Sequence, residues 1–237
     1  MMLAAAGVIS AAIQKSFPAG HDPYWSDVIL LLPFETNFAD ASGRHSVSIT
    51  GSPTIAATGN PATYGTNCAG FGAGNRITFP DSPDWNYGQN VDFTIEFWMR
   101  PDAADLSGIH AVMLQRSGLG MEFGLYNGKL FMWFDNATLY NSGLTFTAGN
   151  AYYIKITREY LSGVNSNHDS RWRVVINGAE DANFLANWTL PDNSAAVAIG
   201  GDNYGAGQHF YGKLKDLRIT RHSRNDDTVP VAPHPTF

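Results

Sequence analysis

The sequence predicts an all-β protein in which two antiparallel sheets pack face to face as a jelly-roll sandwich, with a short N-terminal helix and an extended C-terminal arm. Three observations lead to this prediction. Short β-branched and aromatic runs begin at Val28, turn residues separate them at short intervals, and helical periodicity is absent from that point on. We expect residues 1–26 to form an arm and linker, residues 27–224 the sandwich, and residues 225–237 the C-terminal arm.

The N-terminal arm is predicted to contain one short helix. The segment from Leu3 to Gln14 is rich in good helix formers, and Pro18 and Gly20 cannot continue it. A helix of this length is marginal in isolation, so we expect it to be ordered only when docked on a neighbour. Tyr24 and Trp25 in the linker either join that contact or pack on the domain that follows. The predicted assembly residues are Leu3, Val8, Ile9, Ile13, Phe17, Tyr24 and Trp25.

The sandwich is predicted from short runs that are bounded by Gly, Asn, Asp or Pro, the residues that favour turns. The predicted strands are Val28–Phe34, Ser46–Thr50, Arg76–Phe79, Asp92–Arg100, Ala111–Gln115, Glu122–Tyr126, Lys129–Phe134, Tyr152–Arg158, Arg171–Ile176, Ala196–Ile199 and Tyr211–Thr220.

Two Asn-Gly pairs predict tight reversals of the chain. Asn and Gly accept the positive φ angles of a type I′ turn, whose twist matches antiparallel strands. Asn127-Gly128 should therefore fix the register of the strands on either side. Asn177-Gly178 ends the strand Arg171–Ile176 in the same way, although the polar segment that follows does not identify the partner strand.

Alternation within the strand Asp92–Arg100 indicates which side chains face the core. Every second residue is apolar, and these form the expected core face: Phe93, Ile95, Phe97 and Met99. The residues between them should form a semi-exposed outer surface: Thr94, Glu96, Trp98 and Arg100. Similar alternation in Tyr152–Arg158 and Tyr211–Thr220 favours two packed layers.

Composition excludes several classes of function. Only 15% of the residues are charged, the net charge is -6, and no run of Lys or Arg occurs, so we expect no nucleic-acid partner. The longest apolar stretch, Leu3 to Ile13, is far shorter than the roughly 20 residues that cross a bilayer, so no membrane span is expected. The single Cys68 cannot form an internal disulfide, and we expect a small buried hydrophobe rather than a reactive thiol.

Several segments follow one another in an order typical of one family. The run Asp27–Phe34 leads into a turn with Asp40 and Gly43, and the block FTIEFWMRP follows from Phe93. YNGKLFMWF, AYYIKITR, RWRVVINGA and GKLKDLRITRHSR come next. Together, from about Asp27 to Arg224, they resemble a laminin G-like domain of the concanavalin A-like lectin/glucanase superfamily. The resemblance implies a concanavalin A-like jelly roll.

The two ends of the domain resemble one particular group within this superfamily. The opening segment Asp22–Val28, and the closing strand followed by the Pro-rich end Val229–Pro235, resemble versions of the domain in tailed-bacteriophage virion proteins. This implies localisation in the virion, with other capsid or tail proteins as partners. Copies on a symmetric shell or tail would make the protein a homo-oligomer.

The superfamily includes β-glucanases, whose carboxylates occupy alternate residues of one strand in an E-x-D-x-(x)-E pattern. This sequence lacks that pattern, since the same-face neighbours of Glu96 are Thr94, Trp98 and Arg100. Three other glutamates also lack the second carboxylate of this pattern: Glu122, Glu159 and Glu180. No serine elbow is present either. We therefore expect no catalytic residue and no enzyme activity.

Laminin G-like domains often hold Ca²⁺ at the sandwich rim, so the resemblance implies calcium as a candidate cofactor. Hard cations prefer carboxylate and amide oxygens, which Asp135 offers in one loop, and Asp202 and Asn203 in another. Asp and Asn in loops also serve as turn formers, and that reading stays open. Asp202 is the best single candidate.

Lectin-like sandwiches bind sugars with exposed aromatic side chains beside polar loop groups. The candidates here for contact with a glycan or a partner are Trp188, Tyr204, Tyr140 and Trp85, with Asn203 beside them. Each of these aromatics could instead be a core or protein-interface residue.

Taken together, the sequence favours a non-enzymatic structural or decoration protein on the surface of a tailed-phage capsid or tail. Its sandwich would contact other virion proteins and a cell-surface glycan. The alternative is a carbohydrate-binding module for adhesion or receptor binding, and a glycoside hydrolase is the weaker alternative.

Overall fold

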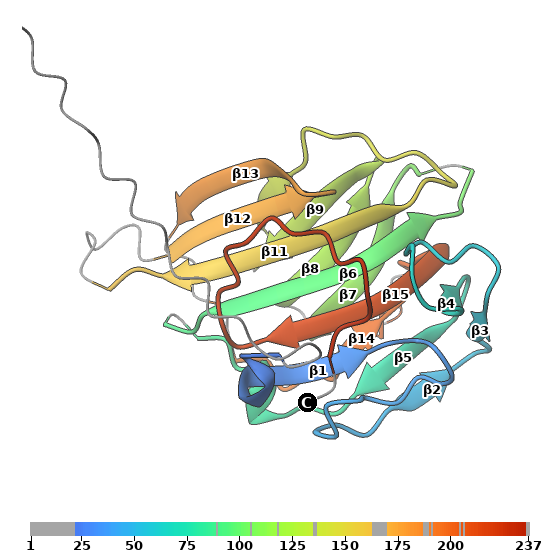
Figure 1. The fold of residues 1–237 in the computed structure, drawn as a ribbon, viewed down its shortest axis with the longest axis horizontal. Helices are drawn as coiled ribbons and strands as arrows, with labels where there is room; N and C mark the ends of the chain where they lie inside the picture. Colours follow the sequence, from blue (N-terminus) through green and yellow to red (C-terminus); the bar gives the residue numbers. More distant parts are fainter. Residues whose placement is uncertain are drawn as a thin grey trace, which may run out of the picture.

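The computed structural model describes residues 22–88, 90–104, 106–117, 119–134, 137–162, 170–186, 190, 192–203, 205 and 207–235 (Figure 1). Over this part of the chain two antiparallel sheets pack face to face, with two short 3₁₀ helices, η1 (Trp25–Asp27) and η2 (Pro83–Trp85). The predicted all-β sandwich is confirmed. The helix predicted from Leu3 to Gln14 lies outside the described residues. None of the described helices has the length and apolar character needed to cross a membrane.

The first sheet, sheet A, is built around three long central strands. Its order is β13 (Ala179–Ala186), β12 (Ser170–Ile176), β11 (Tyr152–Tyr160), β6 (Phe93–Pro101), β15 (Gly212–Thr220), β4 (Cys68–Phe71) and β3 (Thr54–Ala56), and β1 (Val28–Leu32) also pairs with β15. The second sheet, sheet B, lies behind it in Figure 1. Its order is β10 (Ala137–Asn141), β9 (Lys129–Phe134), β8 (Leu119–Tyr126), β7 (Ile109–Ser117), β14 (Val197–Ile199), β5 (Arg76–Phe79) and β2 (Ser48–Thr50).

All the predicted strands are present, Arg76–Phe79 and Lys129–Phe134 with the predicted bounds and the others with one or both ends shifted. The sequence missed β3, β4, β10 and β13. Two of these strands, β4 and β13, show why they were not predicted. The strand β4 is mostly small residues, including the buried Cys68, and β13 is a polar strand at the edge of sheet A with several exposed residues. Neither has the alternation of a half-buried strand.

Both Asn-Gly pairs form tight turns. Asn127 and Gly128 have φ angles of 50° and 72°, and Tyr126 pairs with Lys129 across the β8–β9 hairpin. The register predicted there is therefore confirmed. Asn177 and Gly178 adopt the same left-handed backbone, and the strand that follows is β13, which the sequence did not identify as the partner.

The core-facing set of β6 is confirmed, but its outer face is not semi-exposed. Phe93, Ile95, Phe97 and Met99 all lie in the core between the sheets. On the other face Glu96 is only 1% exposed and Trp98 8%. Residues 222–235, which we call the strap, cross this face near Thr94 and Glu96. Trp98 is instead in contact with Tyr64 and Tyr153.

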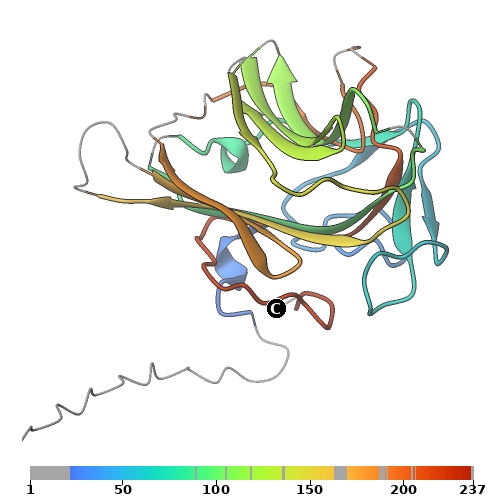
Figure 2. The same ribbon diagram turned by 90° about the horizontal axis from the view of Figure 1, so that it is seen from above.

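The strap lies on the outer face of sheet A, as the red segment in Figures 1 and 2 shows. Thr94 Oγ1 donates to the His222 carbonyl at 2.8 Å, and Lys155 Nζ donates to the Asp226 carboxylate at 2.9 Å. The described part of the predicted C-terminal arm, residues 225–235, thus makes contacts within its own chain. This arm packs on its own sheet, because that sheet offers the charged partners it needs.

The turn after β1 is organised by the buried carboxylate of Asp40. Its Oδ1 accepts hydrogen bonds from the backbone of Leu31 at 3.0 Å and Ser42 at 2.9 Å. Its Oδ2 accepts from the backbone of Arg44 at 3.2 Å and His45 at 3.0 Å. One side chain therefore satisfies four backbone N–H groups and fixes the turn to β1.

Replacing Asp40 by alanine is expected to lower the free energy of unfolding by about 2 to 4 kcal/mol, because buried donors would lose their acceptor. Urea denaturation of the two proteins measures this change. Ser42→Ala is the control, since the Ser42 hydroxyl takes part in the same turn but serves fewer backbone groups. Equal losses in the two variants would contradict the role given to Asp40.

Candidate functional site

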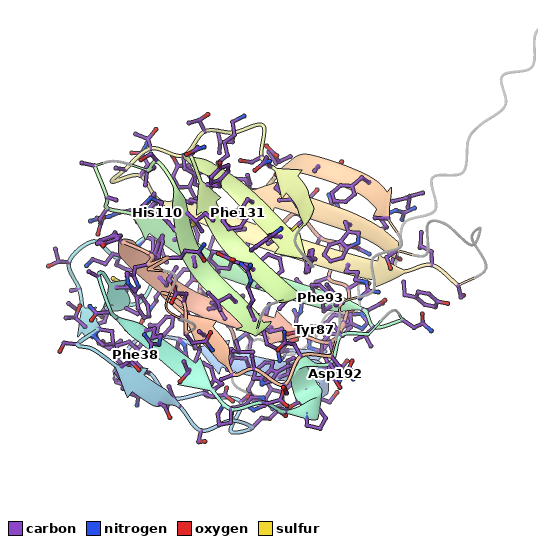
Figure 3. All side chains as sticks on the ribbon, turned by 180° about the vertical axis from the view of Figure 1, so that it is seen from behind. Phe38, Tyr87, Phe93, His110, Phe131 and Asp192 are labelled. Carbon is purple, nitrogen blue, oxygen red and sulfur yellow. The ribbon has the colours of Figure 1, made fainter. Side chains whose placement is uncertain are left out.

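The outer face of sheet B carries a compact group of polar and aromatic side chains. In β8 the neighbours Met121 and Phe123 point into the core, so Glu122 points to the outer face. Glu122 pairs with Trp133 of β9, whose side chain shares that face. Figure 3 looks onto this side of the molecule, and Figure 2 shows that the green strands of sheet B curve away from sheet A at their ends.

Arg116 of β7 contacts one side chain of β8 and one of β9. Its Nη1 lies 3.1 Å from Glu122 Oε2, and its guanidinium carbon lies 3.6 Å from the centre of the Trp133 ring. A cation over an aromatic face is a favourable contact, and it fixes the orientation of the indole. Arg116 and Trp133 are partly exposed, whereas Glu122 is fully buried.

Aromatic side chains continue along the same face toward the β8–β9 turn. Phe131 pairs with Gly124 across the hairpin, and its ring lies 6.4 Å from that of Tyr126, which is 45% exposed. Figure 3 shows Phe131 on this side of the sheet. Beyond the turn lies a hollow of about 440 Å³ whose lining includes Asn127 and Phe146. Phe131 is itself buried, so Trp133 and Tyr126, beside the partly exposed Arg116, are the aromatic groups of this set that a ligand could contact.

The Glu122 carboxyl has a raised pKa. Burial, assisted by the charge of Asp202, raises its pKa to about 7 although Arg116 acts in the opposite direction. Its Oε1 is buried and has no hydrogen-bond partner among the described residues. Near neutral pH the group therefore exists both as carboxylate and as acid, and it can accept or donate a hydrogen bond.

This pKa predicts a pH dependence of stability. Between the ordinary value of 4.5 and about 7 the folded state binds more protons than the unfolded state. The free energy of unfolding should therefore fall as pH rises through this window, by up to about 1.4 kcal/mol per pH unit, and change no further above it. Glu122→Gln should lose this part of the dependence, because glutamine does not titrate.

Urea denaturation at pH 5 and pH 8 measures the effect, as the difference between wild type and variant at each pH. Glu159→Gln serves as the matched control, since Glu159 lies on sheet A in a partly exposed ion pair with Arg171. A Glu122→Gln protein that loses as much stability between the two pH values as wild type would contradict the account.

The predicted calcium ligands are not brought together by the described residues. The Asp202 oxygens accept from Gly205 N at 3.0 Å and Gln208 N at 2.6 Å, so this carboxylate closes its own loop. Asn203 Nδ2 donates to the Ala196 carbonyl at 3.1 Å. Asp135 lies outside the described residues. Within the described part of the chain no cluster of three or more His, Cys, Asp or Glu side chains is placed to hold a metal, and calcium stays a prediction.

Two of the predicted glycan contacts are core residues, so that part of the prediction is corrected. Trp85 is 1% exposed and its indole nitrogen donates to the Pro80 carbonyl at 2.9 Å. Tyr140 is buried in the core, and its hydroxyl donates to Asp181 of β13. Trp188 and Tyr204 lie outside the described residues.

The linker aromatics contact the domain that follows them. Tyr24 stacks on His222 with ring centres 3.9 Å apart, and the Arg224 guanidinium lies 5.0 Å from the tyrosine ring. Trp25 lies in η1 and is partly buried. Their assembly role stays a prediction. The other predicted assembly residues fall outside the described part of the chain: Leu3, Val8, Ile9, Ile13 and Phe17.

Glu96 has no acidic partner along its own strand, as expected, but it is not solitary in space. It accepts from Tyr153 Oη at 2.5 Å and from Arg218 Nε at 2.8 Å, and Arg218 Nη1 also lies 2.6 Å from Asp22. Burial alone would raise the pKa of Glu96, but the positive charge of Arg218, with that of Lys155, lowers it well below its usual range. Glu96 is a permanent charge rather than a proton donor.

Comparisons with known proteins give a family for this arrangement. The family model described as the concanavalin A-like lectin/glucanases superfamily matches residues 71–230. No curated protein matches the chain by sequence.

Solved structures share the fold at low sequence identity. The binding domain of Paraclostridial Mosquitocidal Protein 1 matches with a TM-score of 0.65 and 17% identity, over 85% of this chain and 50% of that one. Domain 4 of AbnA, a GH43 extracellular arabinanase from Geobacillus stearothermophilus solved with arabinotriose, matches with a TM-score of 0.60 and 16% identity, over 83% of this chain and 93% of that one.

A structure of botulinum neurotoxin type C, from work on its cell entry through two ganglioside molecules, has a TM-score of 0.64 and 15% identity, over 85% and 49% of the two chains. The chain thus spans about half the length of the toxin structures it matches.

Proposed function

The chain belongs to the concanavalin A-like lectin/glucanase superfamily, and from this membership we propose that it is a non-enzymatic carbohydrate-binding protein whose ligand lies on the outer face of sheet B. The observation that carries the proposal is the partly exposed Trp133 ring, whose orientation is fixed by the partly exposed Arg116 guanidinium 3.6 Å from its centre. The apolar C–H face of a sugar ring packs on an indole, while its hydroxyl groups bind charged oxygen and nitrogen atoms.

The similar structures support a glycan as the ligand class. The arabinanase domain was solved with arabinotriose, and the work on botulinum neurotoxin type C concerns two ganglioside molecules. Both are saccharides, one a neutral chain and the other the headgroup of a lipid. We therefore choose arabinotriose and soluble ganglioside headgroups as the first probes.

The charged groups of this face support binding rather than hydrolysis. Glycoside hydrolysis uses two carboxyl groups about 5 to 10 Å apart, both free to act on the substrate. Among the described residues the charge of Asp202 acts on Glu122, but both oxygens of Asp202 are held by backbone N–H groups of its own loop. Asp202 therefore supports the loop, and Glu122 lacks a free acidic partner in this part of the chain.

A glycan array probed with the full chain tests the proposal, with arabinan oligosaccharides and ganglioside headgroups among the spots. We expect saturable binding to at least one saccharide class, and no release of reducing ends when the protein is incubated with the bound polysaccharide. Absence of binding to every saccharide, or release of reducing ends, would contradict the proposal.

We further propose that the domain is displayed on a phage virion as one of several copies, attached through its N-terminal segment to capsid or tail proteins. Asp22, the first described residue, binds Arg218 and Arg224 on the outer face of sheet A. An attachment there would leave the outer face of sheet B free for a glycan. Deleting residues 1–21 should abolish incorporation into particles and leave glycan binding unchanged. Normal incorporation of the deleted chain would contradict the attachment.

A further inference from the structure

The strap is held on sheet A by side chains rather than by a backbone ladder. Among the described residues, no backbone–backbone hydrogen bond joins residues 222–235 to the sheet. Thr157 Oγ1 donates to the Arg224 carbonyl at 3.4 Å, and Arg173 pairs with Asp227. The strap is therefore bound as a separate extended peptide would be, and its release breaks no strand pairing.

The far end of the strap is anchored by His234. Its backbone N–H donates to Asp216 Oδ2 at 3.1 Å, and the same oxygen accepts from the Tyr64 hydroxyl at 2.7 Å. The side chain of His234 is only 6% exposed. Its Nε2 lies 3.9 Å from Asp216 Oδ2 and has no hydrogen-bond partner among the described residues. Burial of a ring nitrogen that has no hydrogen-bond partner favours the neutral form of the imidazole.

The surroundings of His234 contain several charges of both signs. These groups act on His234 or line a hollow of about 150 Å³ beside it: Asp216 and Arg218 of β15, Glu96 of β6, Tyr153 and Lys155 of β11, and Arg224 and Asp226 of the strap. Asp22 forms ion pairs with both arginines. Burial is the largest effect and lowers the pKa of His234. Arg218 and Arg224 act in the same direction, whereas Glu96 and Asp216 oppose it.

We propose that the strap is a pH-sensitive cover, which protonation of His234 releases from sheet A at mildly acidic pH. A charged imidazole loses its hydration when the strap is closed, and Glu96 and Asp216 offset only part of this cost, whereas it is hydrated when the strap is open. Release uncovers a face that holds Lys155, Glu96 and Arg218. The device does not depend on glycan binding by sheet B.

The sign of the effect follows from linkage. In the open strap His234 has an ordinary pKa of about 6.5, and in the closed strap the pKa is lower. The ratio of closed to open strap is therefore constant above that pH. Below it the ratio falls by up to about tenfold per pH unit until the closed-state pKa is reached. The pKa values of Asp22 and Glu96 are themselves lowered, so both stay charged throughout this range.

Hydrogen exchange of the residue 234 amide, followed by NMR on the full chain between pH 7.5 and 5.5, tests the proposal. After correction for the intrinsic pH dependence of exchange, we expect this amide to exchange faster as pH falls below 6.5, while the Ile95 amide in β6 does not. His234→Gln keeps the backbone donor and removes the titration, so its amide should show no acceleration. His222→Gln, in the same strap, should respond as wild type does.

Three results would overturn the proposal. The wild-type amide could exchange at a constant corrected rate, the His234→Gln amide could accelerate as wild type does, or Ile95 could accelerate together with the strap, which indicates global unfolding. If His234→Gln does not hold the strap at pH 7.5, the NMR titration of the wild-type imidazole decides. A pKa of 6.5 or above for His234 would contradict the proposal, and a lower one would support it.

Discussion

Glu96→Ala is expected to lower the free energy of unfolding by about 3 to 5 kcal/mol, the range observed when one partner of a buried ion pair is removed. Arg218 is 5% exposed and would keep only Asp22 as its partner, and Lys155 would lose a carboxylate 3.8 Å away. The cost arises less from the lost attraction than from buried positive charge that Asp22 and Asp226 compensate only in part.

Urea denaturation at pH 7 measures this loss. Glu180→Ala is the matched control, because Glu180 also binds an arginine of sheet A, Arg173, but on an exposed edge strand where solvent screens the charges. It should have a much smaller effect. Similar losses in the two variants would show that the buried cluster is no more important for folding than a surface ion pair.

Trp133→Ala is expected to weaken glycan binding by about 30-fold, equivalent to about 2 kcal/mol, without a loss of fold. The indole would supply the flat face on which a sugar ring packs, and Arg116 fixes its orientation from 3.6 Å. Trp133→Phe keeps an aromatic face and should lose less affinity than the alanine variant.

Isothermal titration with the glycan that gives the strongest array signal measures these affinities. Tyr211→Ala is the control, since Tyr211 is an aromatic residue with 40% exposure located just before β15. It should bind as wild type does. Equal affinity of Trp133→Ala and wild type would remove Trp133 from the binding surface.

Much of the fold follows from local features of the sequence. Alternation placed Phe93 and Ile95 in the core, and Asn127-Gly128 fixed the β8–β9 register. The same two rules, applied to LGMEFGLY and KLFMWF, would have put Glu122 and Trp133 side by side on the outer face. That part of the candidate site is therefore predictable from the sequence.

Other features depend on contacts between distant parts of the chain, so local sequence patterns do not predict them. A register shift in β7 between Ala111 and Met113 breaks the alternation that would have placed Arg116. The cluster around Glu96 joins β6, β11, β15, the strap and the N-terminal linker, so no search within one strand detects it. The buried outer face of sheet A near Glu96 has the same cause, because the strap that crosses it there is polar and rich in proline.

Chemical-shift mapping by NMR, with the strongest glycan from the array titrated into the full chain, tests the central proposal most directly. The account predicts that the largest perturbations fall on the Trp133 indole, the Arg116 guanidinium and Tyr126, and that the strap on sheet A is unaffected. Perturbations confined to the outer face of sheet A, or none at saturating glycan, would contradict it.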